Sequence, residues 1–151
     1  MPDGVFGIMD AQGPNSLSTD QLFSGRKVIL VSVPGAFTPT CSMNHLPGYV
    51  DLADELMAKG VDTIACMAVN DVFVMNAWGQ SANADKIAML ADGNGEFAKS
   101  LGLEMDASGF GMGERSQRFA LIADDGVVSH LFIEAPGEYR VSAAEHVLLS
   151  L

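Results

Sequence analysis

The sequence predicts a mixed α/β fold, in which helices cover both faces of one central sheet. Two observations point to this class. Short apolar runs alternate along the chain with segments of helical periodicity, as in β-α-β units, and a hairpin followed by a helix ends the chain. With 151 residues, of which 48% are hydrophobic and 18% charged, the chain is long enough to bury a core. We expect residues 1–151 to form a single domain.

The expected strands are apolar runs bounded by turn residues. Lys27–Val33 is the clearest, because it is almost continuously apolar and fits a strand buried on both faces. The other expected strands cover residues 5–9, 61–69, 87–90, 119–123 and 127–133. Asp124-Asp125-Gly126 is expected to form the hairpin turn between the last two, and residues 17–23 fit either a short helix or a strand.

The expected helices begin at capping residues and end at glycines. The longest runs from Thr38 to Lys59 and stops at Gly60, and Pro47-Gly48 is expected to kink or divide it. Three shorter helices are expected: one capped by Asn70-Asp71 and closed by Gly79, one over 96–101, and one over 143–149 opened by a capping box of Ser142 and Glu145. The Gly-rich residues 104–117 are expected to form a long loop.

Composition and charge exclude several functions. Eight Lys and Arg against 19 Asp and Glu give a net charge of −11, which argues against nucleic-acid partners and anionic membranes. The 3 His and 2 Cys stand at no zinc-ligand spacing, and the glycines at 109–113 precede a strand rather than a helix, unlike a nucleotide loop. We therefore expect no metal and no cofactor. With no signal peptide and no apolar run of about 18 residues, we expect a cytoplasmic protein.

The chain is organised around the stretch between Val33 and Ser42. Pro34-Gly35 ends the preceding strand, Thr38 fits a helix N-cap, and Pro39 fits the first helical position. Cys41 then lies in the first turn, where unpaired N–H groups and the helix dipole favour a thiolate over a thiol. The stretch therefore predicts a reactive cysteine. The alternative interpretation is a buried, inert cysteine.

The same stretch resembles the peroxiredoxin family. The family motif, Pro-x-x-x-Thr/Ser-x-x-Cys, is met by Pro34, Thr38 and Cys41. Residues 41–48, 69–78 and 115–121 resemble the type-II, or type-five, subfamily in particular. The resemblance covers nearly the whole chain. It implies a thioredoxin-like fold and reduction of hydrogen peroxide and organic hydroperoxides through a cysteine sulfenic acid.

The resemblance also implies roles for single residues. Cys41 is the peroxidatic cysteine, Thr38 and Arg118 are its partners, and Pro34 shields it from water. A permanent cation suits both a thiolate and a peroxide, because it cannot lose its charge by titration. The residues alone leave simpler roles open: a plain N-cap for Thr38, a strand end for Pro34 and a surface ion pair for Arg118. They also do not distinguish Arg118 from Arg115.

Cys66 has two interpretations. It lies in the middle of an expected strand, which is typical of a small buried hydrophobe. The alternative is a resolving cysteine, which plant type-II relatives carry at the corresponding place. A disulfide with Cys41 needs Cα atoms within about 7 Å, and a strand cysteine reaches it only by local unfolding. We favour a one-cysteine cycle completed by an outside thiol; the resemblance implies glutathione with glutaredoxin, and thioredoxin is the alternative.

Aromatic residues near the expected site have two interpretations. Phe37, Phe73 and Trp78 are candidates for an apolar patch, which either packs as core or marks a subunit contact. The resemblance implies a homodimer joined near the active-site loops. His45 follows Cys41 by four residues, on the same helix face, and is expected to tune the thiol weakly. The rival function is a thioredoxin-like redox sensor or binding module, in which Cys41 reacts but does not turn over.

Overall fold

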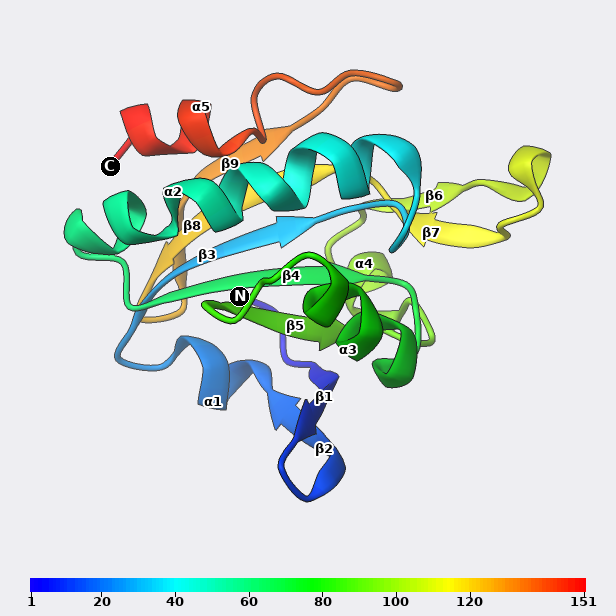
Figure 1. The fold of residues 1–151 in the computed structure, drawn as a ribbon, viewed down its shortest axis with the longest axis horizontal. Coiled ribbons are helices and arrows are strands. Elements are labelled where there is room, and N and C mark those ends of the chain that lie inside the picture. The colour runs from blue at the N-terminus through cyan, green and yellow to red at the C-terminus, as the bar shows by residue number, and fades with distance from the viewer.

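A computed structural model describes all 151 residues, which are built around one large sheet (Figure 1). Its strands are β1 (Val5–Asp10), β2 (Gly13–Ser18), β3 (Lys27–Ser32), β4 (Thr63–Ala68), β5 (Ile87–Ala91), β8 (Phe119–Asp124) and β9 (Val127–Ile133). Their order is β2-β1-β5-β4-β3-β8-β9. β3, β4 and β5 are parallel, whereas β1, β8 and β9 pair with their neighbours antiparallel. The predicted mixed sheet is confirmed.

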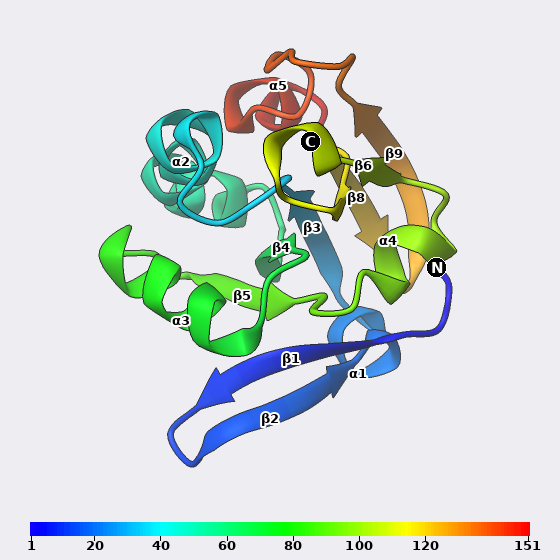
Figure 2. The same cartoon turned by 90° about the vertical axis from the view of Figure 1, so that its right-hand side faces the viewer.

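Helices cover both faces of this sheet, as predicted. They are α1 (Thr19–Phe23), the π-helical turn η1 (Cys41–His45), α2 (Leu46–Ala58), α3 (Val72–Ser81), α4 (Glu96–Ser100), the 3-10 turn η2 (Ser108–Phe110) and α5 (Ala144–Leu149). Figure 2 shows α2, α3 and α5 on one side and α1 and α4 on the other. None of these helices has the length and apolarity that crossing a bilayer requires.

The alternation of side chains along the strands divides the core into two clusters. On β3, Ile29 and Val31 pack with the cluster under α2, α3 and α5, whereas Val28 and Leu30 pack with the cluster under α1 and α4. Because both faces are covered, β3 is apolar throughout. The carboxyl ends of the parallel strands lie at one end of the sheet (right in Figure 1), where the loops after β3 and β4 meet.

The helix that carries Cys41 differs from the prediction. It runs without a break from Pro39 to Ala58, so Pro47-Gly48 does not divide it into two helices as expected. Instead the helix widens over Cys41–His45, where the Leu46 N–H donates to the Cys41 carbonyl. A proline has no N–H and its ring crowds the carbonyl four residues earlier, and a wider turn just before Pro47 relieves that crowding.

Three further expectations are corrected. α3 continues past Gly79, so this glycine does not end the helix. It allows a close approach of α3 to β5 instead, since a Cβ there would lie 2.7 Å from Met89 Cγ. Residues 104–117 form a hairpin of β6 (Glu104–Asp106) and β7 (Glu114–Ser116) rather than a loop, and it projects from the sheet in Figure 1. Ser142 does not cap the last helix, because its hydroxyl donates to Glu134.

Candidate active site

Cys41 lies in the first turn of its helix, as the sequence predicts. The helix begins at Pro39, and the Ser42 N–H donates to the Thr38 carbonyl at 2.9 Å. The Cys41 side chain is fully buried, at 0% exposure. The unpaired amides and the positive end of the helix dipole therefore act on a sulfur that water screens little.

The sheet register brings Arg118 to this sulfur. Arg118 immediately precedes β8, whose first residue, Phe119, pairs with Ser32 at the end of β3. Arg118 therefore lies beside the loop that leads into the Cys41 helix. Its Nη2 donates to Cys41 Sγ at 3.1 Å. The guanidinium thus brings a permanent positive charge and an N–H donor to the sulfur.

Arg115, which the sequence does not distinguish from Arg118, has a different position. Its Nη1 donates to the Val69 carbonyl at 3.0 Å and its Nε to the Met112 carbonyl at 2.9 Å. Val69 directly follows β4, and Met112 lies in the β6–β7 hairpin. Arg115 thus braces two backbone segments next to the site, whereas Arg118 contacts the sulfur.

The loop between β3 and the helix holds Pro34 and Thr38, both half-buried. The Thr38 hydroxyl donates to the Gly35 carbonyl at 2.7 Å and forms no side-chain cap, so the N-cap interpretation is wrong for its side chain. The Ala36 N–H donates to Asn70 Oδ1 at 2.9 Å, which ties this loop to the loop after β4. Pro34 follows the strand end as expected, and its role in excluding water stays a prediction.

His45 contacts Arg118 directly, which its four-residue spacing from Cys41 did not indicate. It is fully buried, and its two ring nitrogens have different partners. Nδ1 lies 2.8 Å from Arg118 Nη1, and Nε2 lies 3.0 Å from the Ser142 carbonyl oxygen. Burial first, and then the Arg118 cation, lower the pKa of His45 to about 3, so the ring is neutral at neutral pH.

Comparisons with known proteins show which family the chain belongs to. A model of the family described as Redoxin matches residues 1–148, and Peroxiredoxin-2B of Arabidopsis thaliana is 48% identical over 153 residues, covering 100% of this chain and 94% of the relative. The chain belongs to the peroxiredoxin family. This peroxiredoxin is therefore a thiol-dependent peroxidase with a thioredoxin-like fold, and the predicted family, fold and enzyme class are confirmed.

Solved structures share the fold along nearly the whole chain. Reduced Prx3 from Vibrio vulnificus, in complex with H2O2, matches with a TM-score of 0.96 and 54% identity, covering 99% of this chain and 94% of that one. The Plasmodium falciparum antioxidant protein, a 1-Cys peroxiredoxin, matches with a TM-score of 0.91 and 33% identity, over 97% and 92% of the two chains. Membership of this family favours an enzyme over the rival redox sensor.

The second cysteine of this peroxiredoxin is held in the sheet. Cys66 lies in β4, paired with Val31 of β3 on one side and Met89 of β5 on the other. It is 1% exposed, and both cysteines are free thiols. Burial raises the pKa of the Cys66 thiol, and the nearby Cys41 raises it further. At neutral pH Cys66 is therefore a protonated, poorly nucleophilic thiol.

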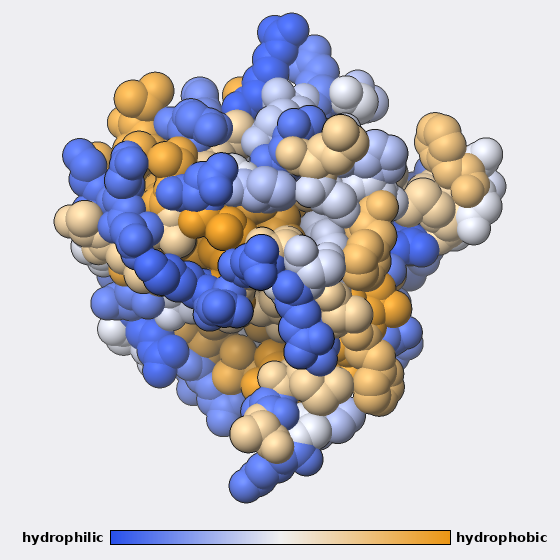
Figure 3. All heavy atoms as spheres, in the orientation of Figure 1, coloured by the Kyte–Doolittle hydropathy of each residue, from blue (hydrophilic) through white to orange (hydrophobic).

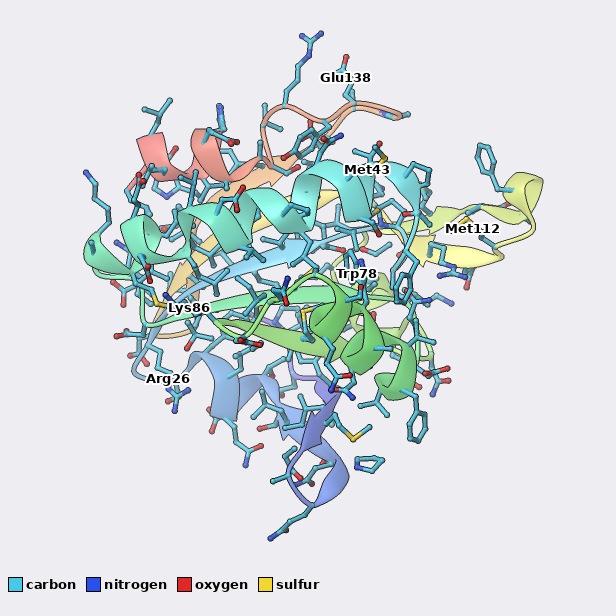
Figure 4. The ribbon with its side chains drawn as sticks, in the orientation of Figure 1. Arg26, Met43, Trp78, Lys86, Met112 and Glu138 are labelled. Carbon is cyan, nitrogen blue, oxygen red and sulfur yellow. The ribbon has the colours of Figure 1, made fainter.

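The predicted aromatic patch is only partly exposed. Phe37 and Phe73 are 54% and 62% exposed, whereas Trp78 is buried and packs as core, one of the two arrangements expected for these aromatics. Trp78 rises from α3 toward the start of the Cys41 helix (Figure 4) and donates from Nε1 to Ser42 Oγ at 2.9 Å. In Figure 3, residues of high hydropathy lie on the right-hand side of the molecule, over the loop before the helix and over α3. Met43, 75% exposed, adds to this surface.

A cavity of about 340 Å³ lies between the β1–β2 hairpin, α3 and β5, and neither Cys41 nor Arg118 borders it. No group of three His, Cys, Asp or Glu side chains is placed to hold a metal.

Proposed function

We propose that Cys41 is the nucleophile of this peroxidase and that Arg118 is its cationic partner. The observation that carries the proposal is the 3.1 Å contact between Arg118 Nη2 and Cys41 Sγ. The thiolate attacks the terminal oxygen of the hydroperoxide, so that an S–O bond forms and the O–O bond breaks. The departing oxygen takes the electron pair and a proton and leaves as an alcohol or water. The product on the enzyme is a sulfenic acid.

The residues around the sulfur supply what the transition state needs. Charge develops on the departing oxygen, and a guanidinium with several N–H donors can stabilise it while still facing the sulfur. The Thr38 hydroxyl, bonded to the Gly35 carbonyl, can rotate to donate to a bound peroxide oxygen. Pro34 limits the access of water to the sulfur. Hydrogen peroxide and organic hydroperoxides are the proposed substrates, and the H2O2 complex of the Vibrio relative supports the first of them.

An outside thiol completes the proposed cycle. It attacks the sulfenic sulfur, forming a mixed disulfide and releasing water, and a second thiol then displaces Cys41 as a thiolate. The position of Cys66, hydrogen-bonded into the sheet through both neighbouring strands, argues against an internal disulfide. Glutathione with glutaredoxin is the proposed donor, and thioredoxin is the alternative.

Mass spectrometry of the intact protein tests the cycle. After one equivalent of hydrogen peroxide without reductant, the parent is expected to gain one or two oxygen atoms, and Cys41→Ser is expected to gain none. Loss of two hydrogens in the parent, absent from Cys66→Ala, would instead show a Cys41–Cys66 disulfide. Sustained turnover by Cys41→Ser would refute the assignment of the nucleophile. Steady-state rates with glutathione and glutaredoxin, set against thioredoxin and its reductase, identify the donor.

Residues 1–151 act as one domain, because a single sheet borders both core clusters.

Two copies of the chain associate through the apolar surface of Phe37, Met43 and Phe73, close to the Cys41 helix. The protein acts in the cytoplasm, in keeping with two unpaired cysteines. Sedimentation is expected to show a dimer that Phe73→Asp weakens; a parent that sediments as a monomer contradicts this part.

A further inference from the structure

A buried carboxylate closes the loop that follows β9. Glu134 is 6% exposed, and its backbone N–H donates to the Arg118 carbonyl at 3.0 Å. Its Oε2 accepts from the Arg140 N–H at 2.7 Å, the Ser142 N–H at 2.9 Å and the Ser142 hydroxyl at 2.6 Å. Burial opposes the charge, but hydrogen bonds from Ser142 and Arg140 outweigh it and lower the pKa of Glu134. We call Glu134 with residues 140–142 the clasp.

The clasp directs one backbone carbonyl at the Cys41 helix. The Ser142 carbonyl oxygen accepts from the Tyr49 hydroxyl at 2.6 Å and lies 3.0 Å from His45 Nε2. A carbonyl can only accept, so Nε2 must carry the imidazole proton. The clasp therefore selects one tautomer of His45, with a lone pair on Nδ1.

That lone pair faces Arg118. Nδ1 lies 2.8 Å from Arg118 Nη1, and a guanidinium can only donate. The guanidinium is planar and rigid, so fixing Nη1 also fixes the direction of Nη2, which donates to Cys41 Sγ. The Tyr139 ring packs edge-on against His45, with ring centroids 5.1 Å apart, and its hydroxyl donates to the Asn44 carbonyl.

We propose that Glu134 and Ser142 position Arg118 against Cys41 by fixing the tautomer of His45. No hydrogen bond joins the clasp or His45 to Cys41 Sγ, whose side-chain partner is Arg118. The clasp and His45 are therefore positioning residues and not catalytic ones. The inference rests on the proposed roles of Cys41 and Arg118. Arg118 is half-buried and has several rotatable bonds, so it needs the acceptor at His45 Nδ1 to keep its contact with Cys41 Sγ.

His45 itself offers a matched pair of substitutions. His45→Asn keeps an acceptor near the position of Nδ1, whereas His45→Gln keeps a donor near Nε2 and loses the acceptor for Arg118. In His45→Gln we expect the thiolate fraction of Cys41 at neutral pH and the second-order rate with hydrogen peroxide to fall about tenfold, the size of one hydrogen bond to a charged group. His45→Asn is expected to recover most of the loss. His130→Gln, on the exposed β9 strand, is the control.

The clasp is tested in the same way. Glu134→Ala removes the acceptor of three hydrogen bonds and is expected to reduce the same two quantities about tenfold, and Glu134→Gln, which keeps an acceptor oxygen, is expected to recover them. Glu138→Ala is the control, because it removes a carboxylate of the same loop, and the Glu138 side chain points into solvent (Figure 4). The thiolate fraction is read from its ultraviolet absorbance over a pH series, a readout that lost stability alone does not shift.

The outcomes separate this inference from the proposed function. Arg118→Ala is measured in parallel. If it lowers the thiolate fraction while folded His45→Gln and Glu134→Ala keep the parent's pH profile, the positioning inference is overturned and the roles of Arg118 and Cys41 stand. If Arg118→Ala also keeps the parent's profile, the proposed function fails. Should Glu134→Ala not fold, the comparison of His45→Gln with His45→Asn decides alone.

Discussion

Removing the cation at the sulfur is the most direct test of the site. Unit charges at the 3.1 Å separation of Arg118 Nη2 and Cys41 Sγ attract by about 5 kcal/mol at an effective dielectric constant of about 20, and by about 1.3 kcal/mol in bulk water. Cys41 is buried but Arg118 is half-exposed, so solvent screening favours a value of about 2 kcal/mol. Arg118→Ala is therefore expected to lower the ratio of thiolate to thiol about 30-fold.

The assay is the ultraviolet absorbance of the thiolate against pH, together with the rate of hydrogen peroxide reduction by stopped flow. The rate is expected to fall further than the thiolate fraction, because in the proposed mechanism Arg118 also stabilises the departing oxygen. Arg118→Lys keeps the charge but not the two-pronged contact, and is expected to lie between parent and Arg118→Ala. Arg26→Ala changes the net charge equally from an exposed side chain far from the site. If Arg118→Ala titrates and reacts as Arg26→Ala does, the reasoning from the contact is wrong.

Three other expectations follow from the structure. Cys66→Ala is expected to keep peroxidase turnover with an outside thiol; loss of turnover in steady-state assays would require Cys66 in the cycle. The folded-state pKa of His45 is about 3 against an ordinary 6.5, so the unfolded chain binds an extra proton between these values. The free energy of unfolding is therefore expected to fall by about 1.4 kcal/mol per pH unit as the pH decreases through this window. Urea unfolding at several pH values measures it, and the slope of this free energy against pH must differ between the parent and His45→Gln. Gly79→Ala places a Cβ 2.7 Å from Met89 Cγ and is expected to cost about 1–3 kcal/mol in thermal unfolding, whereas Gly109→Ala meets no neighbouring atom within 4 Å and is the neutral control.

Local sequence signals predicted six strands of the large sheet and the place of Cys41, but they missed β2 and the β6–β7 hairpin. The apolar run 27–33 and the Pro-Gly break identify β3 and its end, and the Thr38-Pro39 pair identifies the helix start. These signals depend on neighbouring residues, which is why they succeed. They failed at Pro47 and Gly79, where a wider turn and a close contact with β5 override the usual effects of proline and glycine.

The parts of the site that depend on distant residues could not be predicted. The pairing of β8 with β3 brings Arg118 to the sulfur, whereas Arg115 lies in β7 and is placed by the pairing of β7 with β6. Neither register is visible in a single sequence, and only the family resemblance favoured Arg118. The tautomer of His45 depends on Ser142, 97 residues away. Its only sequence signal was the four-residue spacing from Cys41, which predicts a shared helix face but not a hydrogen-bond partner.

The position of Cys66 has a consequence for how the enzyme fails. β4 is an interior strand, hydrogen-bonded to β3 and β5 along its length, so in the proposed one-cysteine cycle an oxidised Cys41 depends on a thiol from outside the chain. The sulfenic acid then waits for a thiol from the surroundings, and a second peroxide competes for it, converting it to the dead-end sulfinic acid. The resistance of this enzyme to inactivation is thus set by the ratio of thiol to peroxide around it, and a cell short of reductant loses the catalyst itself.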